Sequence, residues 1–222
     1  GDRVLQSIVP IAVGGNTVLA MGESALAPDV PPDAQAALVF SPRAADVLAM
    51  AVNLGGDPPT LFSLGIVGST REALFRITAD GPGAPRTRLL RWDGNPDHGP
   101  RRLARSGDHI PGGRLIEVTQ IADSPLGPVI LASVQDGPGE KTALLVLRRG
   151  KLRPLIQVGT PLDNGAVLTG IRETVSGTAR GIILQGTIQR PGMQDPTPAI
   201  LVRTRRTIHT ILAAGGTTPP YG

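Results

Sequence analysis

The strongest constraint on the fold of this chain is a short junction, rich in Gly, Asp and Pro, that recurs at nearly constant spacing. Its five copies begin at Gly1, Gly56, Gly107, Gly159 and Gly216. Self-similarity at a fixed period is typical of repeat architectures, in which one small structural unit is built several times. We therefore describe the chain as a single repeat domain of four units, 1–55, 56–106, 107–158 and 159–215, and residues 216–222 start a further unit or form a tail.

Each unit contains pairs of short apolar runs joined by turn residues. Ala37–Phe40 and Val47–Val52 flank one tight turn, and Leu144–Leu147 and Leu152–Val158 flank another. Runs of Val, Ile, Leu and Thr bounded by Gly, Pro, Asp and Ser are typical of β-strands, and none of these runs has a helical period. The same pattern predicts further strands over 5–13, 17–21, 73–77, 115–122, 128–134, 181–188, 200–202 and 207–212.

The size of the unit favours an all-β, β-propeller-like fold of four tandem four-stranded antiparallel units. At about 55 residues, the unit is slightly longer than a common propeller blade. A blade cannot bury both of its faces alone, so neighbouring blades must stack on each other to form a core. A β-solenoid or tandem sandwiches are the alternatives, and the period alone does not separate them. Apolar runs such as Ile182-Ile183-Leu184 predict central strands that are buried on both faces.

The composition excludes several classes of function. Hydrophobic residues make up 40% of the 222 residues and aromatic residues only 2%, so aliphatic side chains must fill the core. The absence of cysteine excludes disulfides, thiolate catalysis and cysteine-ligated metals. No stretch approaches the ~18 consecutive apolar residues of a membrane span. The net charge is +4, but proteins that bind single-stranded nucleic acid pair Arg with stacking aromatics, so we expect no nucleic-acid partner.

One junction carries a resemblance to a known group of proteins. The run Gly107-Asp108-His109-Ile110-Pro111-Gly112-Gly113 precedes a predicted strand, and Gly68 with Phe75 forms a Gly-to-Phe segment. This layout resembles the bacterial choice-of-anchor tandem-repeat proteins that contain an NxxGxxxF motif. The resemblance implies β-propeller-like repeats and export to a periplasmic, cell-surface or extracellular location. It also implies a scaffold role, and it assigns no ligand.

The sharpest local motif is an acidic loop between two predicted strands. Asp93, Asn95 and Asp97 place oxygen side chains at alternate positions, which is the start of a calcium-binding loop. The match is incomplete because Ala104 stands where such a loop has a bidentate Glu. Calcium is therefore the one cofactor that the sequence suggests, and the alternative is an expanded hairpin loop between residues 89–92 and 101–105.

Other polar residues do not form a recognisable catalytic pattern. His98, His109 and His209 fall in three units without the spacing of a zinc site. Serines such as Ser41, Ser124 and Ser176 are predicted in turns, and no Gly-x-Ser-x-Gly elbow surrounds them. The junction residues Asp2, Asp57 and Asp108 would either form an acidic rim or, as we favour, accept backbone N–H groups and fix turns. The sequence thus favours a non-enzymatic role and assigns no catalytic residue.

Arginine clusters recur near the second hairpin of successive units. They comprise Arg101-Arg102 with Arg105, Arg148-Arg149, and Arg203 with Arg205-Arg206. Such clusters can bind an acidic partner or an acidic polysaccharide. Charge on edge strands also discourages aggregation, and the sequence favours this second role.

These features together predict an exported structural or protein-interaction scaffold that assembles through its terminal repeats. If the four units do not close into a ring, the first and last would expose apolar faces, among them residues of Leu5–Val13 and Ile182–Leu184. Such faces need a protein partner or a second copy of the chain. The alternative is a ligand-binding or hydrolytic β-propeller that uses a central channel. The opening Gly1-Asp2, without Met or a signal peptide, suggests a trimmed piece of a longer precursor.

Overall fold

The fold is all-β, as the sequence predicted. The computed structural model describes residues 2–14, 16–52, 62–69, 72–79, 86–95, 97–162, 165–178, 181–204 and 207–214. These residues form seventeen strands, and no helix occurs among them. The predicted junction residues Gly56, Asp57 and Gly216 lie outside this part of the chain, as do Arg205 and Arg206.

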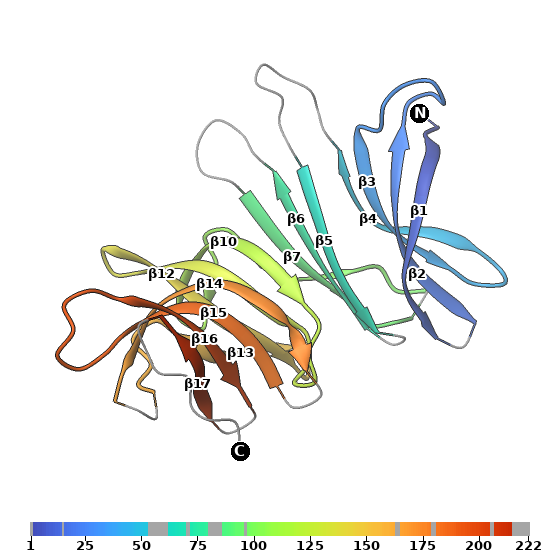
Figure 1. The fold of residues 1–222 in the computed structure, drawn as a ribbon. Coiled ribbons are helices and arrows are strands. Elements are labelled where there is room, and N and C mark those ends of the chain that lie inside the picture. Colours follow the sequence, from blue (N-terminus) through green and yellow to red (C-terminus); the bar gives the residue numbers. More distant parts are fainter. Residues whose placement is uncertain are drawn as a thin grey trace. The chain divides into compact units, whose positions relative to one another are not determined.

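The strands form four antiparallel sheets, each built from consecutive strands (Figure 1). Sheet A contains β1 (Val4–Gly14), β2 (Thr17–Ala25), β3 (Ala34–Phe40) and β4 (Ala45–Val52). Sheet B contains β5 (Phe62–Ser69), β6 (Glu72–Ala79), β7 (Arg86–Trp92) and β8 (Arg101–Arg105). Sheet C contains β9 (His109–Ile110), β10 (Gly113–Ala122), β11 (Val129–Asp136), β12 (Gly139–Arg148) and β13 (Lys151–Gln157). Sheet D contains β14 (Val167–Thr178), β15 (Gly181–Gln189), β16 (Thr197–Arg203) and β17 (Ile208–Ala213).

The same β-bulge recurs in all four sheets. It interrupts the register of the last strand pair of each sheet, at the dipeptides Ala37/Leu38, Leu89/Leu90, Leu144/Leu145 and Ile200/Leu201. A bulge bends a strand and shifts which side chains oppose each other, so its position fixes how the fourth strand presents its residues. The bulge therefore provides a common reference point for comparing the faces of the four sheets.

Two junctions share one hydrogen-bond pattern. The N–H of Gly107 donates to the carbonyl of Leu115 at 2.7 Å, and the N–H of Gly159 donates to the carbonyl of Leu168 at the same distance. Both glycines have a positive φ, of 93° and 94°, which other residues adopt only at a cost. The recurring glycine of the sequence thus has the same backbone role at both positions.

The chain divides into two compact parts, which we call unit 1 and unit 2 and which are distinct from the four sequence repeats. Unit 1 comprises Gly1–Ile110 with Arg114–Ile121, and unit 2 comprises Pro111–Gly113 with Ala122–Gly222. Sheets A and B lie in unit 1 and share one core, in which Leu19, Val39, Phe75 and Trp92 are buried. Hydrophobic burial of this kind is the main contribution to the stability of a sheet pair.

Unit 2 contains β11 to β13 of sheet C and all of sheet D, and it has a larger aliphatic core between these strands. Leu144, Val146, Leu184 and Leu201 are all buried in it. The expectation that Ile182 and Leu184 lie on an exposed terminal face is therefore wrong, because the alternation of the strand turns them toward sheet C. Ile183, between them, points to the other face of sheet D and is half-buried.

Both units use the same pairing of sheet faces. The first sheet of each packed pair, A with B and C with D, contributes the residue that follows its bulge, Val39 in sheet A and Val146 in sheet C. The second sheet contributes the second residue of its bulge, Leu90 in sheet B and Leu201 in sheet D. Two faces contribute to neither of these cores in the described part of the chain, and they are of opposite kinds: in sheet A the face of Leu38, and in sheet D the face of Ile200.

Candidate functional site

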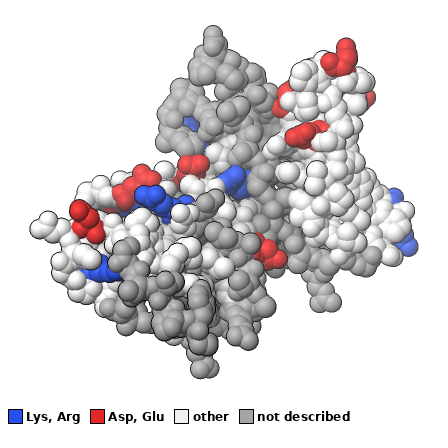
Figure 2. Space-filling view, viewed as in Figure 1, with Lys and Arg blue, Asp and Glu red and all other residues white. Residues whose placement is uncertain are grey.

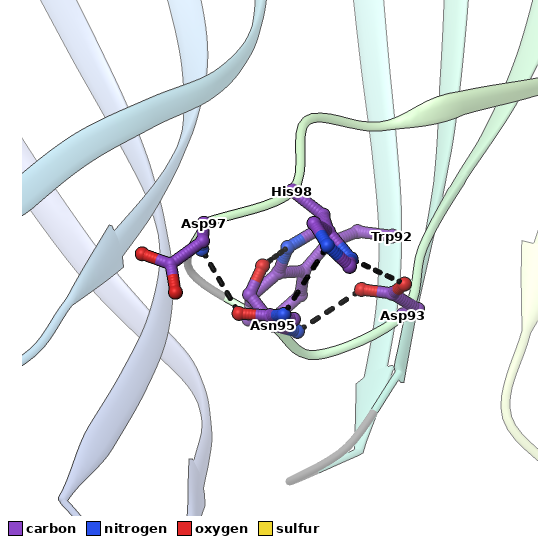
Figure 3. A network of polar contacts seen from close by, with 5 residues as sticks. All are labelled: Trp92, Asp93, Asn95, Asp97 and His98. Carbon is purple, nitrogen blue, oxygen red and sulfur yellow. Dashed lines mark hydrogen bonds and ion pairs between the residues drawn. The ribbon is translucent and has the colours of Figure 1, made fainter.

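The acidic loop lies between β7 and β8. It is an expanded hairpin loop, which is the alternative that the sequence offered to a calcium-binding loop. Asp93 accepts the backbone N–H of Asn95 at 3.1 Å, and its other carboxylate oxygen lies 3.0 Å from Nδ1 of His98 (Figure 3). The side chain of Asn95 accepts the N–H of Asp97 at 3.0 Å. Trp92 anchors the loop, since its indole N–H donates to the carbonyl of Asn95 at 2.8 Å.

The charge of Asp93 is stabilised by this arrangement. The hydrogen bond with His98, followed by that from the N–H of Asn95, lowers the pKa of Asp93 below its ordinary value. Figure 3 shows the carboxylate of Asp97 pointing away from Asp93. The structure thus brings Asp93 and Asn95 together with His98, which the sequence analysis left unassigned, and leaves Asp97 apart. Calcium at this loop stays a prediction.

The junction residue Asp108 fixes a turn. Its carboxylate accepts the N–H of Arg105 at 3.0 Å, and its backbone N–H donates to the carbonyl of Arg105 at 3.0 Å. Thr160 makes the matching contacts with Gln157 at the next junction. The turn-fixing interpretation is therefore confirmed at Asp108.

The remaining polar candidates lie apart from one another. His209 is in β17, where its Nε2 is 2.6 Å from the hydroxyl of Thr207. Ser41 and Ser124 do lie in turns, where their hydroxyls bind nearby backbone groups. Ser176 lies within β14, so its predicted place in a turn is wrong. Among the described residues, no three His, Asp or Glu side chains are grouped so that they could hold a metal ion.

The face of sheet A that points away from sheet B is apolar; it is exposed along its edge strands β1 and β4, whereas Ala20, Ala36 and Leu38 of the central strands are buried. Its register aligns Ile8 with Gly22, Val13 with Val18 and Val47 with Leu38. We call this the outer face of sheet A, and its exposed members are Leu5, Ile8, Val13, Val47 and Met50. Val13 is 63% exposed and Ile8 47%, and none of the residues that the registers place on this face is charged. The predicted exposure of Leu5–Val13 is confirmed at Leu5, Ile8, Val9 and Val13.

The corresponding face of sheet D is smaller and mixed. Ile183 lies opposite Val202, and Ile200 opposite Leu212, on the side away from sheet C. We call this the outer face of sheet D, and the registers also place His209 on it, opposite Val202. Ile200 is 38% exposed and Leu212 44%, and the uncharged Gln185 lies beside Ile200. An apolar sheet face left in water is unfavourable unless a partner covers it.

The arginine clusters occupy different settings in the fold. Arg101, Arg102 and Arg105 lie in β8, Arg148 and Arg149 at the turn from β12 to β13, and Arg203 at the end of β16. On the face drawn in Figure 2, basic and acidic side chains lie close to each other and most of the described surface is uncharged. On this face, the binding of an anion would therefore depend on a local arrangement of cations.

The comparisons with known proteins gave no relative. No protein-family model, no curated protein and no solved structure matches the chain. In the part of the chain that the structure describes, no helix has the length and hydrophobicity needed to cross a membrane.

Proposed function

We propose that this protein is a non-enzymatic, exported scaffold module that self-assembles through its two terminal sheets. The observation that carries this proposal is the exposed, uncharged outer face of sheet A. Soluble monomers rarely leave several large apolar side chains of one sheet face in water, and such a patch typically marks an interface. Burial of apolar surface contributes roughly 25 cal/mol per Å², so covering these side chains favours association.

The occupant of this face is the outer face of sheet D from a second copy. Sheets A and B pack face to face, and so do sheets C and D. In each pair, the first sheet presents the face that holds the residue after its bulge. The second sheet presents the face that holds the second residue of its bulge. Sheet A leaves uncovered the face of Leu38, its second bulge residue, and sheet D leaves uncovered the complementary face of Ile200. Joining these two faces repeats a packing that the chain already uses twice.

A contact between two different faces is heterologous. Heterologous contacts close into a ring when the rotation between copies allows it, and otherwise continue as a filament. The outer face of sheet A in one copy stays available after its sheet D has bound, so a dimer is not the endpoint. This behaviour suits a structural scaffold better than a soluble enzyme.

The arrangement of the four sheets also bears on this proposal. We infer that the four sheets are tandem repeats stacked in the manner of propeller blades. The recurring bulge and the matching junctions at Gly107 and Gly159 support this inference. The resemblance to choice-of-anchor repeat proteins supports export to the periplasm, the cell surface or the medium.

Light scattering combined with sedimentation tests the assembly over a wide range of protein concentration. The wild type should form particles larger than one chain. Ile8→Asp in sheet A and Leu212→Asp in sheet D should each give a monomer, because each puts a charge into one half of the contact. Leu26→Asp is the control, since Leu26 is 64% exposed in the turn after β2 and lies off both faces.

Mixing the two monomeric variants separates this contact from other modes of association. Each variant retains one intact face, so an equimolar mixture should form a 1:1 dimer and nothing larger. If Leu212→Asp assembles as the wild type does, sheet A binds itself and the head-to-tail contact is wrong. A wild type that stays monomeric at all concentrations would refute the proposal.

A further inference from the structure

Unit 2 contains a hollow in which five of the eight lining residues are cations. Its volume is about 810 Å³, and it is bordered by Arg148, Arg149, Lys151, Arg153 and Arg203, with Val146, Pro154 and Leu155 completing the wall. Among the described residues that line it, none is a carboxylate. The volume is within the range of small-ligand sites in proteins.

The strand registers explain why these cations converge. Val146 lies opposite Arg153, and Arg148 opposite Lys151, so the three cations share the face on which Val146 joins the core with sheet D. Arg203 comes from sheet D, where it lies opposite Ile182 and Ile208, which are both buried in the same core. The two sheets therefore direct their cations into one space at the edge of their shared core.

Arg203 is the most enclosed of these cations. Its Nε atom is buried and has no hydrogen-bond partner in the described part of the chain. Burial, followed by the nearby charge of Arg148, lowers the pKa of Arg203. A buried guanidinium N–H without an acceptor is unfavourable, and an anion that enters the hollow would satisfy it.

Arg149 occupies a turn position at which another residue type would give a more stable hairpin. Arg149 has a φ of 50° and Gly150 a φ of 72°, which is the backbone of a two-residue hairpin turn that strongly prefers Asn-Gly. Arg149 is the only residue other than glycine with a positive φ in the described chain. Conformations of this kind concentrate at functional sites, so a cation at this turn indicates a role beyond folding.

We infer that this hollow binds a ligand with two or more clustered oxyanion groups, such as phosphates or carboxylates. Guanidinium groups hold such oxygens through paired, charge-assisted hydrogen bonds, and several cations around one space select for more than one negative charge. The part of the lining that the structure describes contains no aromatic side chain, so recognition by these residues depends on charge and not on stacking. The site is independent of the proposed assembly, because it uses neither outer face.

Two probes distinguish the source of the anion. Calorimetric titration with inorganic tripolyphosphate tests a phosphate ligand, and titration with a short oligogalacturonate tests the carboxylates of an acidic polysaccharide. Binding of either probe supports the site and identifies the preferred oxyanion. The affinity should fall as salt is raised from low to physiological ionic strength, because charge screening weakens the contact. Failure of both probes to bind at low salt would overturn the inference.

Variants locate the site. Arg203→Gln should weaken binding about tenfold or more, because a hydrogen bond to a charged group is lost. The control is Arg101→Gln with Arg102→Gln, which removes more charge from β8 in unit 1 and should change the affinity less than about threefold. An equal loss in the control would mean that the probe follows net charge, and the inference would be wrong.

Arg149→Asn keeps the test valid even if Arg203→Gln disturbs the fold. Asn suits the positive φ at this turn better than Arg does, so the variant should unfold at a higher temperature while it binds the probe more weakly. A role in folding alone cannot produce this combination. Unchanged affinity in both Arg149→Asn and a folded Arg203→Gln would contradict the site.

Discussion

Arg148 and Lys151 lie directly opposite each other across the hairpin of β12 and β13, so two positive charges form a cross-strand pair. Like charges in this relationship destabilise a sheet. We predict that Lys151→Glu raises the free energy of unfolding by roughly 0.5 to 1 kcal/mol, because it replaces repulsion with an ion pair. Urea denaturation at low salt measures the effect. Lys151→Gln should give a smaller gain, and a variant no more stable than the wild type would contradict the prediction.

Gly186 permits a close approach between two strands of sheet D. A Cβ at this position would lie 2.5 Å from the backbone carbonyl oxygen of Gly170, which cannot move without disturbing β14. We predict that Gly186→Ala destabilises the protein by about 1 to 3 kcal/mol. Gly139→Ala is the matched control, since nothing lies within 4 Å of its Cβ position. Thermal unfolding compares the two variants. Equal melting temperatures would show that β14 and β15 can move apart to accommodate the added methyl group without loss of stability.

The loop of Asp93 predicts a specific dependence on pH. His98 and the N–H of Asn95 lower the pKa of Asp93, so the folded state binds a proton there less readily than the unfolded state does. The contribution to stability is therefore complete above the ordinary pKa of aspartate, and it is lost as the pH falls through the lowered value. An NMR titration of the Asp93 carboxyl carbon should show this low midpoint. His98→Ala should raise it, and an unchanged midpoint would show that His98 is not the main cause.

The same loop allows a direct test of the predicted calcium site. Both carboxylate oxygens of Asp93 already accept hydrogen bonds from within the loop, and a calcium ion would compete with the positive charge of a protonated His98 for this carboxylate. We expect millimolar calcium to leave the melting temperature unchanged. A rise that is absent in Asp93→Asn would establish the calcium site and require the loop to rearrange.

Much of the local structure followed from the sequence. The turn residues Ser41-Pro42-Arg43 and Arg148-Arg149-Gly150 marked hairpins, because Gly, Pro and Ser interrupt apolar runs at the ends of strands. The loop from Asp93 was placed between its two strands for the same reason. These features depend on neighbouring residues alone, so a local pattern is sufficient to find them.

The errors arose where burial depends on distant strands. Alternation shows that Ile182 and Leu184 share one face of a strand, but it cannot show which face another sheet will cover. The bulges add to this difficulty, because they shift the fourth strand relative to the third without a clear sequence signal. The sequence identified the clusters at Arg148 and Arg203 as possible anion-binding groups, but it did not predict that they line one hollow, because they come from different sheets and meet only after sheets C and D have packed.

Trp92 is the only tryptophan in the chain, and it is buried in the core of unit 1, with its N–H bound to Asn95. Its fluorescence therefore reports on unit 1 alone. Circular dichroism, in contrast, records the strands of both units. If heating produces one transition seen identically by both signals, the units unfold as one cooperative body. If the ellipticity changes while the Trp92 emission stays constant, unit 2 has unfolded before unit 1. The two signals together then give a separate melting temperature for each unit.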